Sequence, residues 1–422
     1  MVEKARPDKS IPVRGLPFLF AWRYFKAKKS TNAINIIAWI SIIAIVFGTA
    51  ALILVLSVFN GFEGLVRSLY SSFYPDINVS PSSGKVITVT EAQLQKLRTV
   101  PGVRNFSLVA EEKALLRNGD YQSVVSLKGV DDNYRYVTGV EQHLIRGTYK
   151  TGTASDPFLI LGAGVENAVG VQTDRNLLAL NIYVPKRSSS ELIDPLKNIS
   201  EDSINTAGSF VIQQDFDNKY AITNLDFVKT MLGLRENEYG AIEIALRNAA
   251  DADVIKAEIK KIFLSPYRVQ TRYEQNQSLY SIMRAEKWVI YAILVLLMIV
   301  FSFTIVSSLT MLVIEKEKDI SVLHALGGNR SFIQRIFLSE GLLLSVIGGI
   351  VGMLIALLVA WLQVHYKLIP LQGGSFLIDY FPVQLKVGDF FLVGATVLVI
   401  ALIASWIPSK KAARNEFSLR SE

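Results

Sequence analysis

The chain of 422 residues contains no cysteine and only three histidines. Without cysteine it can form neither disulfides nor a metal site built on thiolates. The histidines, His143, His324 and His365, fall in three distant segments and are expected to be ordinary surface or loop residues. We therefore predict that the chain holds no metal.

Motifs of catalysis are scarce as well. The sequence has no Gly-x-x-x-x-Gly-Lys-Ser/Thr phosphate loop, because its only Gly-Lys pair, Gly84-Lys85, is followed by valine. The acidic pairs Glu111-Glu112 and Asp131-Asp132 are isolated, and we expect them to face solvent. The sequence therefore favours a chain that is no enzyme and binds no cofactor.

Charged residues make up 19% of the chain and are unevenly spread. About 20 apolar residues in a helix cross the hydrocarbon of a bilayer, because each residue adds about 1.5 Å to a span of about 30 Å. A core helix of a soluble protein would carry a polar stripe. Four blocks without Asp, Glu, Lys or Arg lack such a stripe and are predicted to be transmembrane helices: 34–60, 288–314, 341–364 and 390–408.

The basic residues flank these blocks instead of forming a patch for nucleic acid. The formal net charge is +7, and Lys and Arg outnumber Asp and Glu in residues 1–33. Loops rich in Lys and Arg stay in the cytoplasm. This rule places both termini and the basic loop 315–340 inside, and the loop 365–389, which is poorer in Lys and Arg, outside. The expected surroundings are membrane lipids and no nucleic acid.

The first helix is expected to continue beyond the membrane as an amphipathic stalk to residue 74, where Pro75 follows. A large external domain lies between this stalk and the second span. The predicted order is a cytoplasmic segment (1–33), transmembrane helix 1 (34–60), the external domain (75–275), helix 2 (288–314), a cytoplasmic loop (315–340), helix 3 (341–364), an external loop (365–389), helix 4 (390–408) and a cytoplasmic tail (409–422).

The external domain has the pattern of a mixed α/β fold. Thr90 to Gln93 fits a capping box at the start of a helix. Residues 186–208 are polar and rich in Ser and Asn, which indicates a long exposed loop. Runs rich in β-branched and apolar residues predict strands near 85–89, 122–130, 158–161, 180–185, 209–216, 241–247 and 267–272.

Three stretches carry a resemblance to a known family. They are "FAWRYFKAKKSTNAINIIAWISIIAIVFGTAALILVLSVFNGFE" (20–63), "EKEKDISVLHALGGNRSFIQRIFLSEG" (315–341), and "FPVQLKVGDF" (381–390) with the C-terminal "PSKKAARNEFSLR". They resemble the permease subunits of the lipoprotein-releasing (Lol) system, the LolC/LolE family. These subunits are FtsX-like, MacB-type (type VII) ABC transporter permeases. Family members commonly read Pro-Ala where this chain has Pro408-Ser409, a mild departure.

The resemblance implies a division of the external domain. A porter-like α/β part would comprise 75–110 and 225–275, and a β-rich sabre-like part would be inserted at 111–224. In related permeases a protruding hook that recruits a periplasmic lipoprotein chaperone occupies the position of loop 186–208. A passive surface loop remains the alternative.

The segment 317–327 is a candidate short amphipathic helix with glycine as its stop. Spacing alone leaves two interpretations open, a helix on lipid headgroups and a rigid lever. The resemblance implies the lever, a coupling helix that rests on an ATPase subunit. The candidate coupling residues are Glu317, Lys318, Asp319, Ile320, Leu323, Leu326 and Gly327.

The predicted spans contain no ionisable side chain, which argues against a proton-coupled carrier or an ion channel and suits a hydrophobic substrate. Removing an acyl chain of about fifteen methylenes from a bilayer costs on the order of 12 kcal/mol. An apolar cavity between spans offsets most of this cost, but release still needs work from outside. The small residues Gly48, Ala50 and Ala51 are expected to permit close helix approach. Candidate cavity residues, each of which equally suits contact with lipid or another helix, are Leu54, Val58, Phe59, Phe62, Ile290, Leu294 and Leu297.

These observations lead to one hypothesis and two alternatives. The hypothesis is a permease subunit in the bacterial inner membrane that extracts lipoproteins from the outer leaflet and passes them to a periplasmic chaperone. Its partners would be two copies of a cytoplasmic ATPase that holds ATP and Mg, and a second permease, identical or homologous. The alternatives are a mechanotransmitting permease for efflux or for control of cell-wall hydrolases, and a membrane receptor or scaffold.

Overall fold

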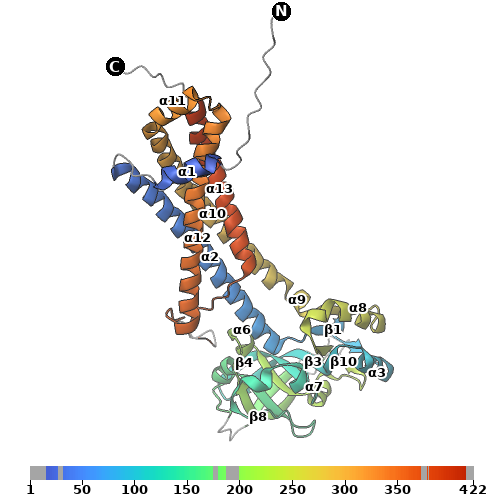
Figure 1. The fold of residues 1–422 in the computed structure, drawn as a ribbon. Coiled ribbons are helices and arrows are strands. Elements are labelled where there is room, and N and C mark those ends of the chain that lie inside the picture. Colours follow the sequence, from blue (N-terminus) through green and yellow to red (C-terminus); the bar gives the residue numbers. More distant parts are fainter. Residues whose placement is uncertain are drawn as a thin grey trace, which may run out of the picture. The chain divides into compact units, whose positions relative to one another are not determined.

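The computed structural model describes residues 16–26, 32–173, 179–186, 199–371, 378 and 380–414. The chain divides into two compact units (Figure 1). The membrane unit comprises residues 1–63, 283–370 and 380–422, and the outer unit comprises residues 64–282 and 371–379.

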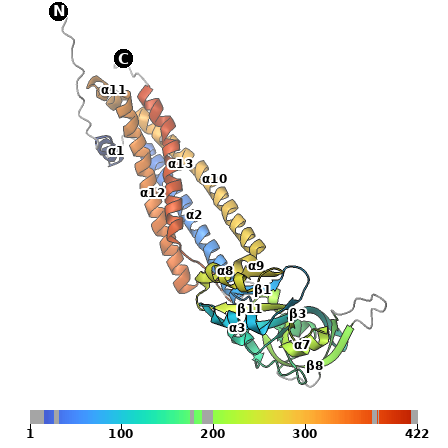
Figure 2. The same cartoon turned by 90° about the vertical axis from the view of Figure 1, so that its right-hand side faces the viewer.

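Among the described residues, four helices are long and apolar enough to cross a membrane: α2 (Asn32–Phe73), α10 (Gln277–Glu315), α12 (Arg330–Tyr366) and α13 (Val387–Arg414). Each contains one of the four charge-free blocks, so the prediction of four helices suited to span a membrane is confirmed. Helix α2 continues to Phe73 and ends before Pro75, as expected for a stalk. The views agree that α12 and α13 run side by side (Figures 1 and 2). Two short helices complete the unit, α1 (Leu16–Lys26) and α11 (Glu317–Ala325).

Small residues bring the spanning helices into close contact. A Cβ on Gly352 of α12 would lie 2.7 Å from the carbonyl oxygen of Val46 and 2.8 Å from the Cβ of Thr49. A Cβ on Gly48 would clash with the sulfur of Met298 in α10. Gly48 therefore permits close helix approach, as expected from the sequence.

The strands of the described residues lie in the outer unit. They are β1 (Ile77–Pro81), β2 (Ile87–Thr88), β3 (Val103–Asn118), β4 (Tyr121–Val130), β5 (Leu144–Gly147), β6 (Phe158–Gly162), β7 (Leu180–Pro185), β8 (Ile199–Phe210), β9 (Tyr220–Asn224), β10 (Glu238–Tyr239), β11 (Ala241–Leu246) and β12 (Tyr267–Thr271). Its helices are α3 (Glu91–Thr99), α4 (Tyr134–Val137), α5 (Ala163–Ala168), α6 (Gln214–Asp217), α7 (Leu225–Leu232), α8 (Ala252–Ile262) and α9 (Arg272–Gln275).

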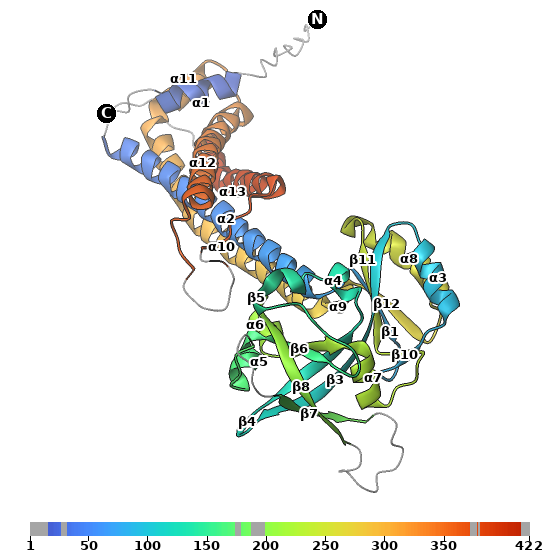
Figure 3. The same cartoon turned by 90° about the horizontal axis from the view of Figure 1, so that it is seen from below.

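One part of the outer unit is a small α/β layer. Strands β12, β1, β11 and the first half of β3 pair antiparallel in that order. Helices α3 and α8 supply apolar residues to the core of this layer, and Figure 3 shows the two helices next to each other. Helix α3 begins with the predicted capping box, in which the side chains of Thr90 and Gln93 each accept from the other residue's backbone N–H.

The other part is a closed barrel. The second half of β3 pairs with β4 on one side and β7 on the other, and the circuit continues through β9, β6 and β8. Closure removes the free strand edges that would otherwise pair with other chains. Helix α7 packs into the core of this barrel through Phe227, Val228 and Leu232. The prediction placed the boundary between the sabre-like and porter-like parts at residue 225, which assigned α7 to the porter-like part. The structure instead places α7 with the barrel, so this boundary lies further towards the C-terminus.

The expected exposed loop 186–208 is wrong in its second half. Residues 199–208 belong to strand β8, which pairs antiparallel with β7 from Leu180 to Pro185. Glu201, Asp202, Ser203 and Asn205 are exposed, while Ile204 and Thr206 are buried. A strand with many solvent-exposed polar residues has the composition of a loop, which explains why these residues were predicted to form one. Residues 187–198 of the predicted hook lie outside the described residues.

Candidate functional site

Helix α11 is a short, well-bounded element between α10 and α12 in the sequence. Its first turn carries Glu317 and Asp319, whose charges suit the positive end of a helix dipole. Gly327 follows with φ of +89°, a conformation that favours glycine. The Asn329 side chain then accepts a hydrogen bond of 2.8 Å from the N–H of Phe332 and caps α12. The predicted helix with a glycine stop is confirmed, and a capped turn joins it to a spanning helix.

The two faces of α11 differ in burial. Ile320 is fully buried and belongs to the apolar core of the helix bundle, so it anchors α11. Leu323 is half-buried. Leu326 is 80% exposed and Val322 is 52% exposed. Val322 was not among the predicted coupling residues, although it lies one helical turn before Leu326, the residue that caps α11.

The candidate cavity residues differ in how deeply they are buried. Leu54 and Leu294 both pack against the apolar core of the bundle, and Val58, Phe59 and Ile290 are half-buried. The Phe62 ring meets that of Phe381 edge-on, with centroids 5.9 Å apart. Leu297 is exposed. Leu54 of α2 and Leu294 of α10 therefore pack against the same core, whereas Leu297 is turned away from it.

A polar cluster, which we call the outer cluster, joins three spanning helices and was not predicted. Asn60 of α2 donates from Nδ2 to Asp389 Oδ2 of α13 at 2.5 Å. Lys287 of α10 donates to Asn60 Oδ1 at 2.8 Å and lies 3.6 Å from Asp389 Oδ1. Asn60 and Asp389 are buried. Lys287 and Asp389 each directly precede a charge-free block. Because the spans were defined by the absence of charge, both residues fell just outside them and were not considered.

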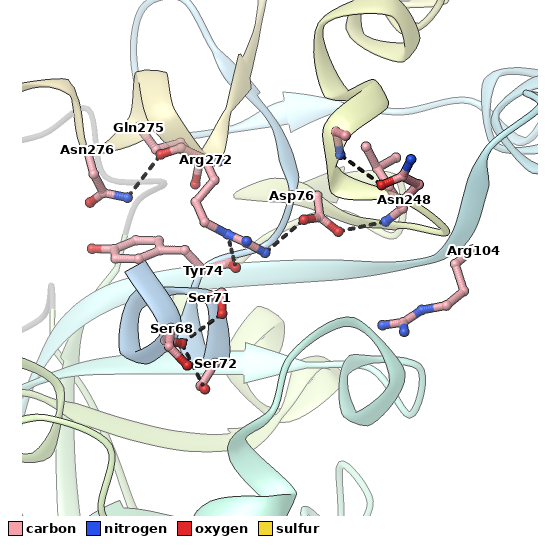
Figure 4. A network of polar contacts seen from close by, with 12 residues as sticks. Ser68, Ser71, Ser72, Tyr74, Asp76, Arg104, Asn248, Arg272, Gln275 and Asn276 are labelled. Atoms are coloured by element: carbon pink, nitrogen blue, oxygen red, sulfur yellow. Dashed lines mark hydrogen bonds and ion pairs between the residues drawn. The ribbon is translucent and has the colours of Figure 1, made fainter. Parts of the chain in front are cut away.

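In the outer unit, a second polar network fixes the end of α2 to the beginning of α9, next to the start of α10 in the sequence. The Arg272 guanidinium donates to the carbonyl oxygen of Tyr74 at 3.1 Å and to Asp76 Oδ1 at 2.9 Å. The other oxygen of Asp76 accepts from the N–H of Leu246 at 2.8 Å. Figure 4 shows Arg272 pointing at both Tyr74 and Asp76. The segments that leave and rejoin the membrane helices are thus clamped together at one arginine.

A buried ion pair lies close to the end of α2 in the same unit. Lys128 Nζ of β4 is 2.6 Å from Glu243 Oε1 of β11, and both side chains are buried. The ammonium also faces the rings of Phe73 and Tyr134, with centroids at 5.1 and 4.9 Å. Burial opposes the charge of Lys128, but the Glu243 carboxylate outweighs burial, so the pKa of Lys128 is raised well above its usual value.

Comparison with known proteins identifies the family. A MacB-like periplasmic core domain matches residues 38–262, which is more than half of the chain, and an FtsX-like permease C-terminal domain matches residues 291–417. The chain belongs to the FtsX-like permeases with a MacB-like periplasmic core domain. Along its length this permease is similar to the lipoprotein-releasing system transmembrane proteins LolC of Neisseria meningitidis and LolE of Haemophilus influenzae. It is 25% and 24% identical to them, over 94% of this chain and 97% of each relative.

Among solved structures, the periplasmic region of MacB from Actinobacillus actinomycetemcomitans matches 50% of the permease and 94% of that chain, at 10% identity and a TM-score of 0.34. The family assignment makes the outer unit of the permease the periplasmic domain, and the permease an inner-membrane protein. In the described part of the permease, no three His, Cys, Asp or Glu side chains are grouped so as to hold a metal ion.

Proposed function

We propose that this permease is the membrane subunit of an ABC transporter that extracts lipoproteins from the outer leaflet of the inner membrane. It passes them to a periplasmic chaperone, and a separate ATPase supplies the work. The observation that carries the proposal is the similarity to LolC and LolE, which spans nearly the whole of this chain and of both relatives. Both termini lie in the cytoplasm in this proposal.

The structure supports a route for the work. Val322 and the capping residue Leu326 form an exposed apolar spot at the C-terminal end of α11. The exposed Lys318 borders this spot, while Ile320 ties the same helix to the bundle core. An apolar spot of this kind suits the surface of a protein partner. Force applied to α11 would reach α12 through the capped turn at Asn329. The wall of α2 and α10 is apolar, which suits acyl chains.

The test replaces Val322 and Leu326 together with Asp in permease reconstituted with its ATPase, a labelled lipoprotein and a soluble acceptor. We expect release to fall by roughly tenfold or more, because charges would be forced into a desolvated contact. Leu368→Asp is the control, since Leu368 is also an exposed leucine, at 63%, but lies in the loop between α12 and α13. Release at the normal rate by the double variant would refute the coupling role of α11.

A second candidate function has one observation in its favour. The match to a MacB-like periplasmic core domain suits a permease that transmits force to a periplasmic partner without moving lipid, as in efflux or the control of cell-wall hydrolases. The same reconstitution separates the two functions. ATP-dependent transfer of lipoprotein to the acceptor supports extraction, and ATP hydrolysis without transfer supports force transmission alone.

A further inference from the structure

The outer cluster of Asn60, Lys287 and Asp389 stands out in a bundle whose contacts are otherwise mostly apolar. Asn60 is fully buried and has both ends of its amide engaged, one with the ammonium and one with the carboxylate. Burying a charge pair costs desolvation, and an apolar trio of similar volume would pack at least as stably. A contact of this cost within a membrane bundle indicates a role beyond stability.

Helix α2 and the segment 382–386, which leads into α13, are joined independently of Lys287. The N–H of Gln384 donates to the carbonyl oxygen of Ser57 at 2.9 Å, and Asn60 Nδ2 also approaches the carbonyl oxygen of Gln384 at 3.3 Å. Gly61 allows this approach, because a Cβ there would clash with the carbonyl of Pro382. The partly exposed pair Glu63–Lys386 lies along the same contact, with the Lys386 ammonium 3.2 Å from the Glu63 carboxylate. Backbone and side-chain contacts thus hold α2 and α13 together at this level.

Helix α10 is joined to these two helices differently. The Lys287 side chain contacts Asn60 and Asp389, and one turn further on Tyr291 Oη meets Thr396 Oγ1 of α13 at 2.5 Å. Lys287 is 27% exposed, so its ammonium lies at the edge of the cluster and not at its centre. The Lys287 side chain therefore joins the outer end of α10 to Asn60 of α2 and to Asp389 of α13 at once.

We infer that Lys287 is a positioning residue that latches the outer end of α10 to the α2–α13 pair, and that release of this latch opens the apolar wall between α2 and α10. Ile290 and Leu294 follow Lys287 at three and seven residues, so all three lie on one face of α10. Moving Lys287 away from Asn60 therefore moves the candidate cavity wall with it. The role in lipid passage rests on the proposed function, whereas the latch itself does not.

The test uses the absence of cysteine from the chain. A single Ile290→Cys substitution in the permease–ATPase complex in nanodiscs reports on the wall through its rate of labelling by a membrane-impermeant maleimide. Adding Lys287→Met is expected to raise this rate by roughly tenfold, because Asp389 then remains buried without its cation and the closed contact is weakened. Lys386→Met removes the partly exposed pair with Glu63 and is the matched control, expected to leave the rate unchanged.

A charge exchange separates a latch from a general loss of packing. In the double variant Lys287→Asp with Asp389→Lys, the amide of Asn60 can turn over and serve the exchanged partners. We expect labelling to return close to the starting rate. An unchanged rate in Lys287→Met, or a double variant that labels as fast as Lys287→Met, would overturn the inference. No lipoprotein is present in this assay, so its outcome is independent of whether the transporter releases lipoproteins.

Discussion

At the scale of single residues, Lys128 and Glu243 give a test of how the periplasmic domain holds the end of α2. Removing one member of a buried pair leaves a buried charge and costs about 3–5 kcal/mol, whereas replacing both with apolar residues is often neutral. We expect Lys128→Met to lower the thermal midpoint of the full-length protein strongly. Adding Glu243→Leu should restore most of the loss. If the double variant were as unstable as the single one, packing around Phe73 and not charge would be responsible.

Glu274 predicts a dependence of stability on pH. Burial opposes its charge, but hydrogen bonds from the Lys256 ammonium and from the N–H of Thr271 outweigh burial, so the pKa of Glu274 lies below its usual 4.5. A lowered pKa stabilises the fold above pH 4.5, and this stabilisation is lost as pH falls through the folded-state pKa. Glu274→Gln should therefore lower the thermal midpoint at neutral pH, and the difference from the unmodified protein should shrink in acid. A difference that persists in acid would contradict this assignment.

The burial and the polar partners of individual side chains were the features of the structure that the sequence predicted least well. Glu112 was expected in solvent but is buried, with Lys85 Nζ 2.6 Å from its carboxylate. Asp131 accepts hydrogen bonds from the Ser107 hydroxyl and the N–H of Leu108. Both carboxylates are satisfied by residues far from them in sequence, and spacing along the chain contains no information on such partners. The outer cluster was missed for the same reason.

At the scale of elements, helices were predicted better than strands. The four spans carry a long signal, because each needs about 20 apolar residues. Strand β3 was missed, although it is 16 residues long and joins both parts of the periplasmic domain. Its Glu111, Glu112 and Lys113 interrupt the apolar alternation that marks a strand. Strand β7, with a clean alternation, was predicted from Leu180 to Pro185 as the structure has it.

The packing of α2 against α12 can be tested at one glycine. Gly352→Ala would place a methyl group against the backbone of Val46, and overpacking of this kind typically costs about 1–3 kcal/mol. A lower thermal midpoint in detergent is the expected result. Gly388→Ala in the first turn of α13 is the control, because no atom lies within 4 Å of its added Cβ. Equal midpoints for the two variants would show that α2 and α12 do not need this close approach.

At the scale of the whole molecule, the proposed topology places the two ends of the membrane helices on opposite sides. Val254 of α8 and Lys410 of α13 are both exposed, and the chain has no other thiol once either is replaced by Cys. In intact spheroplasts, an impermeant maleimide should label Val254→Cys and leave Lys410→Cys unlabelled until the membrane is permeabilised. Labelling of Lys410→Cys in sealed spheroplasts would reverse the assigned orientation.

In the proposed function, the permease holds the acyl chains and a separate ATPase supplies the work of release. An apolar wall lowers the cost of holding acyl chains, but it cannot by itself expel them, since each buried methylene contributes about 0.8 kcal/mol. The sequence contains no phosphate loop for nucleotide. In this account the work reaches the permease through α11, from a subunit that binds and hydrolyses ATP.

The most direct test of this claim is the rate of lipoprotein transfer from proteoliposomes to a soluble acceptor, measured with the permease alone and with its ATPase partner and ATP. The account predicts transfer only when both subunits and ATP are present. Equal transfer by the permease alone would contradict it.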